Sequence, residues 1–571
     1  MTLLSAEGIT AGTLIQPTTA AGIDMNFTEK GVAFGAKAAG EVKAEANTVK
    51  FEVTGVNVNT VDIGAVEWAK GETLADRSDA SYNYAGVTAL GTGNFDMSFA
   101  EGVPEMLAAN DSMTLLQAND TLTAIINEEK IKTYNFEPVT GVTVNATLTG
   151  AVSRSGNNVV FGVTENKAGK LTFGNVEWKD SGALLSRPAN ITFAGADVDT
   201  GSINFTNIQS LEANRQMTLV SDFGDTVGSI TGTKYKVGAA LEGEGAASLS
   251  GSDLVFTTTT AAESLIPTDA THETVMAMEA GTAVVDAGRE FVDSAIEGLG
   301  LVSNMAPDGT ATFAAMGGGA NRYKTGSHVD THTWNAVVAV GRKQELKKGD
   351  LEWGVFAEYG RGNYTLHDDA NGRGDGNTHY AGGGLLAKWT NKHDVYTEAS
   401  VRMGRVSDSA SNMLWNGAVG YGYDVRANYY GGHVGLGKIY KVKGNKDLDV
   451  YGKFFYTKRN GVSFDAGGNH YELDSVDSSL LRVGARYGSN DRKWNWYGGL
   501  AYEYEFSGQS KGTVDGIAIR SASIKGGSVR GELGMRMEAS KTNPWKADIG
   551  IYGYGGRHRG FGGNVSVAYM F

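Results

Sequence analysis

Alternation of apolar and charged residues over twelve strand-length segments constrains the C-terminal part of this sequence most strongly. In the segment 527–540, for example, apolar residues separate Arg530, Glu532, Arg536 and Glu538. Successive side chains of a strand point to opposite faces, so a segment with clear alternation, as several of these have, presents one apolar and one charged face. The segments are 310–320, 330–344, 351–366, 378–391, 394–407, 427–442, 447–460, 479–488, 494–508, 527–540, 545–556 and 561–571. The pattern predicts an antiparallel all-β domain.

Two folds fit this alternation. A soluble sandwich would bury the apolar faces in a core, whereas a membrane barrel would turn them toward lipid and enclose the charged faces. Three features favour a twelve-stranded transmembrane barrel. Short connections such as 344–350 alternate with long ones at 408–426, 461–478 and 509–526, and Tyr and Trp gather near the segment ends, as in bacterial outer-membrane barrels. The last segment also alternates Val565, Val567 and Tyr569 up to a terminal Phe571.

In a barrel, the charged faces would line the lumen. These residues could line a conducting pore, but we expect them to pair with one another and with a helix in the pore, because buried charges need partners. The expected lumen residues are Glu398, Arg402, Arg482, Arg486, Glu503, Glu505, Arg530, Glu532, Arg536 and Glu538.

Residues 268–300 have helical rather than strand periodicity. Thr268 or Thr271 can cap the helix, and Gly298 and Gly300 can end it. About 26 helical residues would span roughly 39 Å. The charged residues of this segment suit a polar pore rather than lipid; an ordinary linker helix packed on a soluble domain is the alternative. The charged residues are Asp286, Arg289, Glu290, Asp293 and Glu297.

Residues 1–265 read as short strands with internal repeats. Met1-Thr-Leu-Leu returns at Met113 and, as Met-Thr-Leu-Val, at Met217, and Gly64-Ala-Val-Glu-Trp68 returns as Gly174-Asn-Val-Glu-Trp178. A period this long predicts a repetitive, solenoid-like β region in which each unit packs on the next. Because Met1 aligns with internal positions of the repeat, we expect the chain to begin inside a longer protein, with its signal peptide upstream.

Composition excludes several function classes for the first half. Residues 1–272 hold 16 Lys and Arg against 32 Asp and Glu, which argues against nucleic acid as a partner. The chain has no Cys, and all nine His lie at or after His272, so the usual zinc ligands and general-base triads are missing from residues 1–265. The spacing of Asp197 and Asp199, and of Glu242 and Glu244, also occurs in calcium sites, but solvated acidic faces are the default interpretation.

Several stretches of the last half resemble the translocator domain of monomeric (type V) autotransporters, and the resemblance covers residues 265–571. It implies a helix through the pore, a passenger on the outside of a bacterial cell, a monomeric barrel in outer-membrane lipid, and insertion by the barrel assembly machinery with periplasmic chaperones. The final Val565, Val567, Tyr569 and Phe571 would be the assembly signal. The matching stretches are Arg322–His328, Val355–Tyr364, Asp449–Tyr456, Leu481–Arg486, Gly499–Phe506, Gly531–Gly534 and Gly553–Gly556.

The sequence therefore predicts a passenger at 1–265, a linker and pore helix at 266–305 and a barrel at 306–571. Self-cleaving members of the family cut between adjacent Asn residues in the pore helix, and residues 273–300 contain no Asn. We accordingly expect an uncleaved adhesin or interaction protein that binds a host or cell-surface ligand, with no catalytic residues, cofactor or metal site. The alternatives are a displayed hydrolase with its active site upstream, including a carboxylate-only glycosidase, and a general porin. Arg373-Gly-Asp375, expected in an external loop, could be an integrin-type ligand or a Gly-rich turn.

Overall fold

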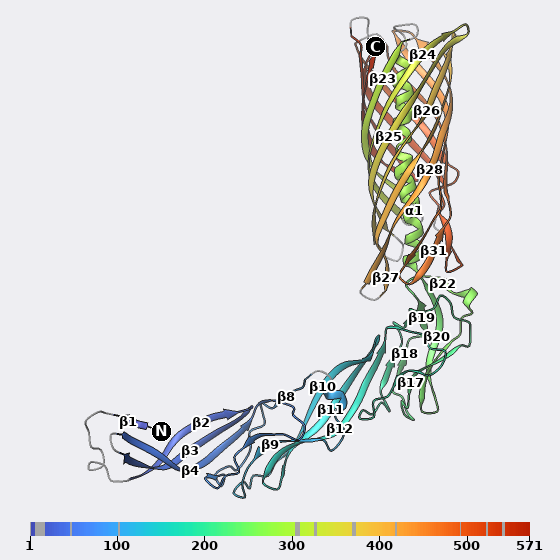
Figure 1. The fold of residues 1–571 in the computed structure, drawn as a ribbon. Helices are drawn as coiled ribbons and strands as arrows, with labels where there is room; N and C mark the ends of the chain where they lie inside the picture. Colours follow the sequence, from blue (N-terminus) through green and yellow to red (C-terminus); the bar gives the residue numbers. More distant parts are fainter. Residues whose placement is uncertain are drawn as a thin grey trace. The chain divides into compact units, whose positions relative to one another are not determined.

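Strands make up nearly all of the chain, and two consecutive helices separate the N-terminal strands from a closed barrel (Figure 1). The computed structural model describes residues 2–5, 18–45, 48–100, 103–302, 309–324, 328–367, 373–416, 419–490, 493–520, 523–539 and 543–570. Contacts divide the chain into two compact units. The first consists of 1–203, 215–234 and 245–257, and the second of 204–214, 235–244 and 258–571. The expected domain boundary near residue 265 stays a prediction.

The barrel confirms the prediction of twelve antiparallel strands. Each strand pairs with its neighbour along the chain, and the last strand closes the barrel on the first, with Ala311 opposite Met570. The strands are β23 (Thr310–Lys324), β24 (His328–Leu346), β25 (Gly349–His367), β26 (Arg373–Asn391), β27 (Val395–Asn416), β28 (Val419–Val442), β29 (Lys446–Arg459), β32 (Val476–Ser489), β33 (Trp494–Glu505), β36 (Gly526–Met537), β37 (Trp545–Gly556) and β38 (His558–Met570).

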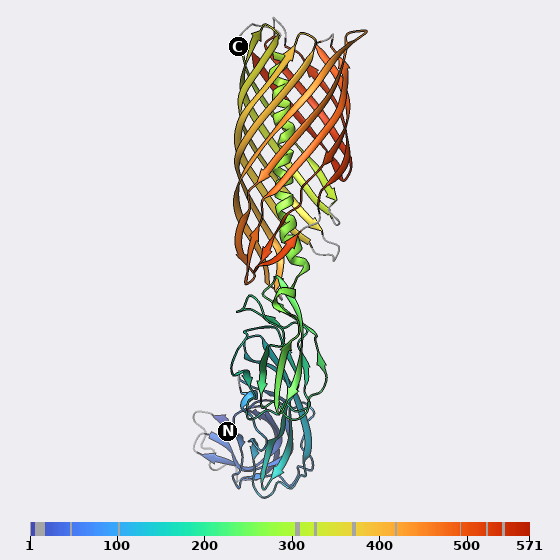
Figure 2. The same ribbon diagram turned by 90° about the vertical axis from the view of Figure 1, so that its right-hand side faces the viewer.

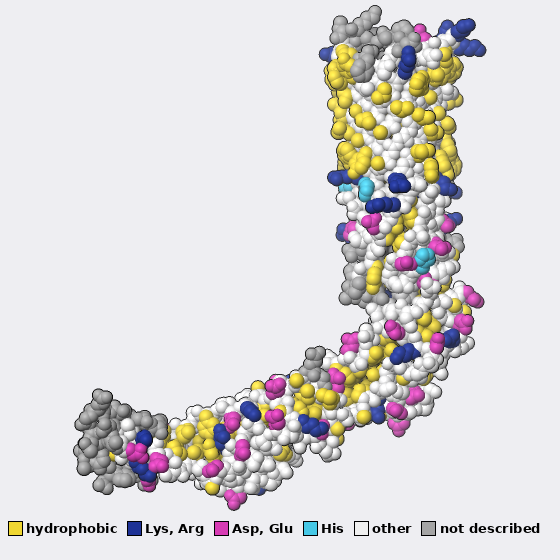
Figure 3. All heavy atoms as spheres, viewed as in Figure 1, with side chains coloured by type: hydrophobic (Ala, Val, Ile, Leu, Met, Phe, Trp, Pro, Cys, Tyr) yellow, Lys and Arg dark blue, Asp and Glu magenta, His cyan; other side chains and the backbone are white. Residues whose placement is uncertain are grey.

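The apolar faces of these strands point outward. Figure 3 shows the resulting apolar band around the barrel, with Lys and Arg side chains along its lower border. A continuous apolar surface of this kind is unfavourable in water and favourable in lipid. Exposed apolar side chains of the band include Val338, Val355, Leu385, Val401, Val434, Leu436, Leu500, Leu533, Ile551 and Phe561.

Three segments expected to be long loops contain strands instead. β27 and β28 continue through 408–426 except for residues 417–418, which lie outside the described residues. Residues 461–478 and 509–526 contribute a separate four-stranded sheet of β30 (Val462–Ala466), β31 (Asn469–Leu473), β34 (Lys511–Val514) and β35 (Ile517–Arg520). Backbone hydrogen bonding thus continues beyond the apolar band, where lipid no longer requires one face to be apolar.

Arg373-Gly-Asp375 also lies in a strand, so its expected placement in a loop was wrong. These are the first residues of β26, paired with His367, Leu366 and Thr365 of β25. Asp375 accepts a hydrogen bond from Thr365 and lies 3.3 Å from the Arg373 guanidinium. The motif is therefore extended and internally paired rather than displayed on a turn.

The predicted helix is present in two pieces, α1 (Asp269–Ala287) and α2 (Arg289–Val302), which run inside the barrel (Figures 1 and 2). Thr268 precedes α1 as expected, but its hydroxyl donates to the carbonyl of Ala239 rather than to the helix. The break falls at Gly288, where a Cβ would lie 2.0 Å from the Tyr380 hydroxyl, so the wall allows no side chain there. Among the described residues, no helix combines the length and the apolar character needed to cross a membrane.

The N-terminal strands form long antiparallel hairpins and short parallel pairs. β2, β3 and β4 make one antiparallel ladder and β10, β11 and β12 another, whereas β6–β9, β12–β15 and β14–β17 pair in parallel. The strands are β1 (Thr2–Ser5), β2 (Thr18–Glu29), β3 (Val32–Glu45), β4 (Thr48–Ile63), β5 (Ala65–Glu67), β6 (Thr73–Asp76), β7 (Tyr82–Asn83), β8 (Asp96–Ser98), β9 (Ser112–Gln117), β10 (Asn127–Val139), β11 (Val142–Ser155), β12 (Asn158–Phe173), β13 (Asn175–Val176), β14 (Ala183–Ser186), β15 (Asp197–Asp199), β16 (Asn204–Phe205), β17 (Gln216–Ser221), β18 (Ile230–Thr231), β19 (Lys234–Val237), β20 (Leu241–Ser250), β21 (Asp253–Thr258) and β22 (Ile266–Pro267), with 3₁₀ turns at Pro104–Met106 and Ala262–Ser264.

The sequence repeats occupy equivalent positions in the first unit. Met113 of β9 pairs with Phe161, and Met217 of β17 pairs with Phe256. Both methionines are buried, and each thioether sulfur accepts an N–H 3.1 Å away, from the residue that follows Trp68 or Trp178. The recurring Met and Trp are therefore core residues, and the glutamates that precede the two Trp are exposed to solvent.

Candidate functional site

The lumen of the barrel is the most highly charged interior in the described part of the chain, and it is built around α1 and α2. Acidic residues of the helices face basic residues of the wall at successive levels. Two cavities beside the helices have volumes of about 40 and 30 Å³, room for a water molecule or a few. The lumen is thus filled by paired side chains, which argues against an open channel.

Arg482 of β32 lies at the centre of the largest charge cluster. Its guanidinium binds Glu290 of α2, and its Nε donates to Glu503 of β33 at 2.7 Å. Arg530 lies 3.3 Å from the same Glu290 and 2.5 Å from Glu532. The Arg482 side chain is only 2% exposed, so its charge is compensated by carboxylates rather than by water.

Glu532 extends this cluster to a further arginine, Arg486, whose Nε donates to it at 2.6 Å. The two residues are on strands that do not pair with each other. Gly499 of β33 lies between them in register, and a Cβ at Gly499 would lie 2.5 Å from the Glu532 carboxylate. The missing side chain at Gly499 therefore lets the two charges meet across the intervening strand.

Lys453 of β29, the ladder partner of Arg482, links the helix to β27. Its ammonium lies 2.5 Å from Asp293 of α2 and 2.7 Å from Glu398 of β27. His433 lies 3.6 Å from Glu398 as well. Asp293, Glu398 and His433 converge closely enough to suggest a metal site, but the Lys453 ammonium already supplies the positive charge at this point.

Arg402 of β27 forms the contact next to the helix break. Its guanidinium donates to the carbonyl of Val285 and to Glu358, both at 3.2 Å, and lies 3.8 Å from Asp286 of α1. Tyr429 donates to the other oxygen of Glu358. The Val285 carbonyl also accepts the N–H of Gly288 at 3.1 Å, so Arg402 adds a second donor to a carbonyl in the last turn of α1.

Arg459 and Asp408 form a fully buried ion pair of 2.9 Å against the middle of α1. Tyr364 and Thr378 both donate to Asp408, which fixes the carboxylate. The helix passes this pair at Gly281, where a Cβ would lie 2.3 Å from the Arg459 guanidinium. Close packing at this level therefore depends on a residue without a side chain.

An apolar cluster surrounds α2 at the other end of the lumen. Phe291, Val292 and Ile296 pack on inward-facing Phe313, Val337 and other residues of β23 and β24. The expectation of a uniformly polar lumen was therefore incomplete. The sequence carries a signal for this cluster, because 310–316 and 336–340 are apolar or small at nearly every position rather than alternating.

The remaining expected lumen residues lie nearer the ends of the strands. Glu505 accepts hydrogen bonds from Ser478 and Ser479, and Arg536 donates to Asp548 at 2.7 Å. Arg289 of α2 lies 3.8 Å from Asp286. Glu538 follows the end of β36 and is half-buried, and the side chain of Glu297 lies outside the described residues.

Several wall residues that touch the helices or their partners were missed by sequence reasoning, among them Glu358, Asp408, Lys453 and Arg459. Lys453 and Arg459 do alternate with the outward residues of β29, so their inward direction could have been inferred. Asp408 could not, because it lies in a segment expected to be a loop.

The expected assembly signal lies on the outer face of β38. Val565 and Val567 are exposed, and the Tyr569 ring packs edge-on against Trp545 at 4.8 Å between centroids. Phe571 lies outside the described residues. Recognition of these residues by the assembly machinery stays a prediction.

Asn469, at the start of β31, holds the chain that leads toward the helix. Its amide oxygen accepts the N–H groups of Ala239 and Ala240 at 2.8 and 3.0 Å. Its amide nitrogen donates to the carbonyl of Val237 and to Asp515. Because this asparagine is buried, with all four hydrogen bonds made, the loop between β19 and β20 is fixed to the sheet at the end of the barrel where α1 begins.

Asp197 and Asp199, one of the acidic pairs considered as calcium sites, have other partners. Asp199 binds the Lys170 ammonium at 2.7 Å. Asp197 accepts both the backbone N–H and the hydroxyl of Ser229, and these hydrogen bonds lower the pKa of Asp197 below its usual range. Asp197 and Asp199 lie on β15, whereas Glu242 and Glu244 lie on β20. The two acidic pairs are therefore on different strands.

Residues 312–551 match the family model described as Autotransporter beta-domain. Among solved structures, the chain is similar to the β domain of the Bordetella autotransporter Brka, at 15% identity and a TM-score of 0.38, over 46% of this chain and 100% of that one. It is also similar to the translocator domain of autotransporter NalP from Neisseria meningitidis, at 12% identity and a TM-score of 0.40, over 50% and 97% of the two chains. No curated protein matches the chain.

The family match and the closed barrel place the C-terminal half in the bacterial outer membrane, with the N-terminal region exported to the cell surface. The outer apolar band meets lipid, and the short hairpins after β24, β26, β28, β32 and β36 are on the periplasmic side. The barrel itself is a translocator and not a catalyst. Residues 312–551, the greater part of the barrel, are therefore an autotransporter β domain.

Proposed function

We propose that this protein displays residues 1–265 as an uncleaved passenger, which the linker and pore helix at 266–305 tether to the barrel at 306–571. The main support for this proposal is the set of ion pairs between the helix and the barrel wall. Glu290, Asp293 and Asp286 each lie beside a basic residue of the barrel. Withdrawing the helix would leave charges of both signs unpaired inside the barrel. A helix held in this way suits a permanent anchor.

The tether predicts that outer membranes contain the passenger and the barrel in one uncleaved species, with a mass of at least the 60.2 kDa of these 571 residues. We expect an antibody against the barrel to detect that species alone after complete denaturation, because residues 273–300 offer no Asn pair for self-cleavage. Protease added to intact cells is the control, since it should convert the band to a shorter membrane-embedded product. A barrel-sized fragment in untreated membranes would contradict the proposal.

We further propose that the passenger is an adhesin or interaction module rather than an enzyme. Residues 1–265 contain neither His nor Cys, and their short parallel strand pairs support a solenoid-like surface of repeats rather than a catalytic pocket. Their excess of acidic residues would favour basic or cationic surfaces as partners. A displayed hydrolase is the second candidate.

The adhesin proposal predicts that cells displaying the chain attach to host cells or to one another. Control cells whose passenger has been removed by surface proteolysis, so that only the barrel-bearing product remains, should attach less. Attachment should weaken as salt is raised, because exposed charges are screened over about 10 Å at 0.1 M. The assays are microscopic counts of attached cells and sedimentation of the culture. Turnover of peptide, ester or glycan substrates by displaying cells, without added attachment, would favour the enzyme instead.

A further inference from the structure

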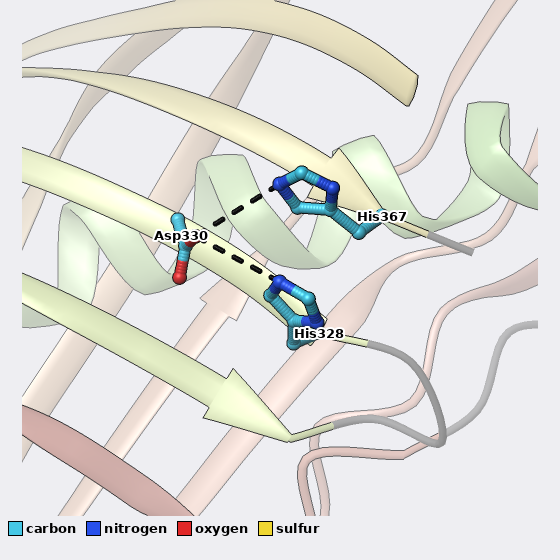
Figure 4. Close-up of side chains that lie close together, drawn as sticks. All are labelled: His328, Asp330 and His367. Carbon is cyan, nitrogen blue, oxygen red and sulfur yellow. Dashed lines mark ion pairs between the residues drawn. The ribbon is translucent and has the colours of Figure 1, made fainter. Parts of the chain in front are cut away.

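Two histidines and an aspartate meet on the outer surface of the barrel, beyond the apolar band (Figure 4). His328 and Asp330 are two residues apart on β24 and so point to the same face. His367, the last residue of β25, is directly opposite His328 in the ladder. All three side chains are half-buried, and they lie on the extracellular side because β24 begins and β25 ends there.

The three side chains converge on one point. The Nε2 atoms of His328 and His367 lie 3.8 and 3.9 Å from the same oxygen of Asp330. The imidazole rings are stacked, with 4.4 Å between centroids and 19° between planes. One ligand atom from each residue lies within 4.8 Å of the other two. Ligand atoms bound about 2.0–2.2 Å from a tetrahedral zinc ion are themselves roughly 3.4 Å apart, so a small adjustment of side chains would suffice.

We propose that His328, Asp330 and His367 form an extracellular binding site for a divalent transition-metal ion, with zinc as the best match. Two imidazoles and a carboxylate are a donor set that open zinc sites use, with water in the remaining position. Nickel and copper accept the same ligands, whereas magnesium and calcium prefer oxygen ligands alone. The site requires no other part of the chain and is independent of the nature of the passenger.

Arg322 supports the carboxylate from the other side. This residue is opposite Asp330 on β23, and its Nε and Nη2 donate to the two oxygens of Asp330 at 2.6 and 2.7 Å. Each carboxylate oxygen has a second lone pair, so Asp330 can bind Arg322 and still face the histidines. Hydrogen bonds of this kind orient metal-binding carboxylates, although the guanidinium charge also opposes the cation and lowers its affinity.

Neighbouring groups distinguish this site from other clusters of the barrel. In the lumen, Lys453 occupies the point on which Asp293 and Glu398 converge. At His470, carboxylates approach the two opposite ring nitrogens, so they cannot share an ion with it. Around His367 the nearest basic partner in the next strand is Arg373, which is paired with Asp375.

The test is calorimetric titration of Zn²⁺ into the full chain, purified in detergent without a polyhistidine tag. We expect one Zn²⁺ per chain, and no comparable binding of Mg²⁺ or Ca²⁺. His328→Ala and His367→Ala should each weaken binding by more than the roughly 10–100-fold lost with an outer-shell partner. His379→Ala is the matched control, because His379 is an exposed histidine on the outer face of the adjacent strand β26 and lies outside the cluster.

Substitution with Co²⁺ supplies a second readout, since cobalt bound by imidazole and carboxylate absorbs visible light according to its geometry. The cobalt spectrum of the parent should disappear in His367→Ala and persist in His379→Ala. Circular dichroism confirms that each variant is folded, which is expected because the substituted side chains lie on the outer surface. The proposal is overturned if the parent binds no Zn²⁺, or if the double variant His328→Ala/His367→Ala binds it with unchanged stoichiometry and affinity.

Discussion

Replacing Arg482 with Met is expected to lower the free energy of unfolding by roughly 3–5 kcal/mol, the usual cost of removing one partner from a buried ion pair. Arg482 compensates Glu290 of the helix and Glu503 of the wall at once. Without it, Glu503 loses its ion pair and Glu290 retains only the longer contact to Arg530. The measurement is urea unfolding of the full chain in detergent, followed by tryptophan fluorescence.

A matched control is Arg373→Met, which removes an arginine from an exposed pair. Such pairs contribute only about 0.2–1 kcal/mol, so its unfolding midpoint should stay close to that of the parent. The double variant Arg482→Met/Glu290→Gln should be less destabilised than the sum of the two single variants, because both act on one contact. Additive effects in that cycle, or equal midpoints for Arg482→Met and Arg373→Met, would refute the assigned role of Arg482.

Much of the barrel could be predicted because its strands obey one rule. Because the outer face of the barrel meets lipid and the inner face is charged, apolar and charged residues alternate along each strand. This alternation shows that the side chains of Arg482, Glu503 and Arg530 point inward, without knowledge of the register. The same rule stops at the edge of the lipid. In residues 408–426 the outward face no longer has to be apolar, so their sequence looks like that of a loop although β27 and β28 continue through much of it.

The contacts themselves required the register and the closure of the barrel. Arg486 meets Glu532 only because Gly499 separates them in the ladder. His328 and Asp330 can be recognised as same-face residues from their spacing, but nothing in the sequence places His367 opposite them. Spacing within one strand can be read from a sequence, whereas partners across strands depend on pairings that many registers would allow.

The tether passes a buried ion pair of the wall at Gly281, and substitution there is expected to have a large effect on display. A Cβ at this position would lie 2.3 Å from the Arg459 guanidinium and 2.6 Å from the Asp408 carboxylate. Neither group can move away cheaply, because they bind each other in a fully buried pair and Tyr364 also holds Asp408. Gly281→Leu should therefore prevent the helix from occupying the lumen as it does in the parent.

We expect Gly281→Leu to reduce the amount of passenger on intact cells by at least about tenfold, since each 1.4 kcal/mol of misfit is a factor of ten. Gly281→Ala should have a smaller effect in the same direction, because overpacking costs about 1–3 kcal/mol and better helix propensity returns up to about 1 kcal/mol. Antibody labelling of unpermeabilised cells measures the surface fraction against total chain.

Ser294→Thr is the matched control for added volume in the same tether. Like Gly281→Ala, it adds one carbon to a helix residue, but Ser294 lines the cavity of about 40 Å³ beside α2, where a methyl group fits. Its display should equal that of the parent. If Gly281→Leu and Ser294→Thr were displayed at the same level, the helix would not need to pass the Arg459–Asp408 pair. The proposal that a charge-paired helix inside the lumen anchors the passenger would then be refuted.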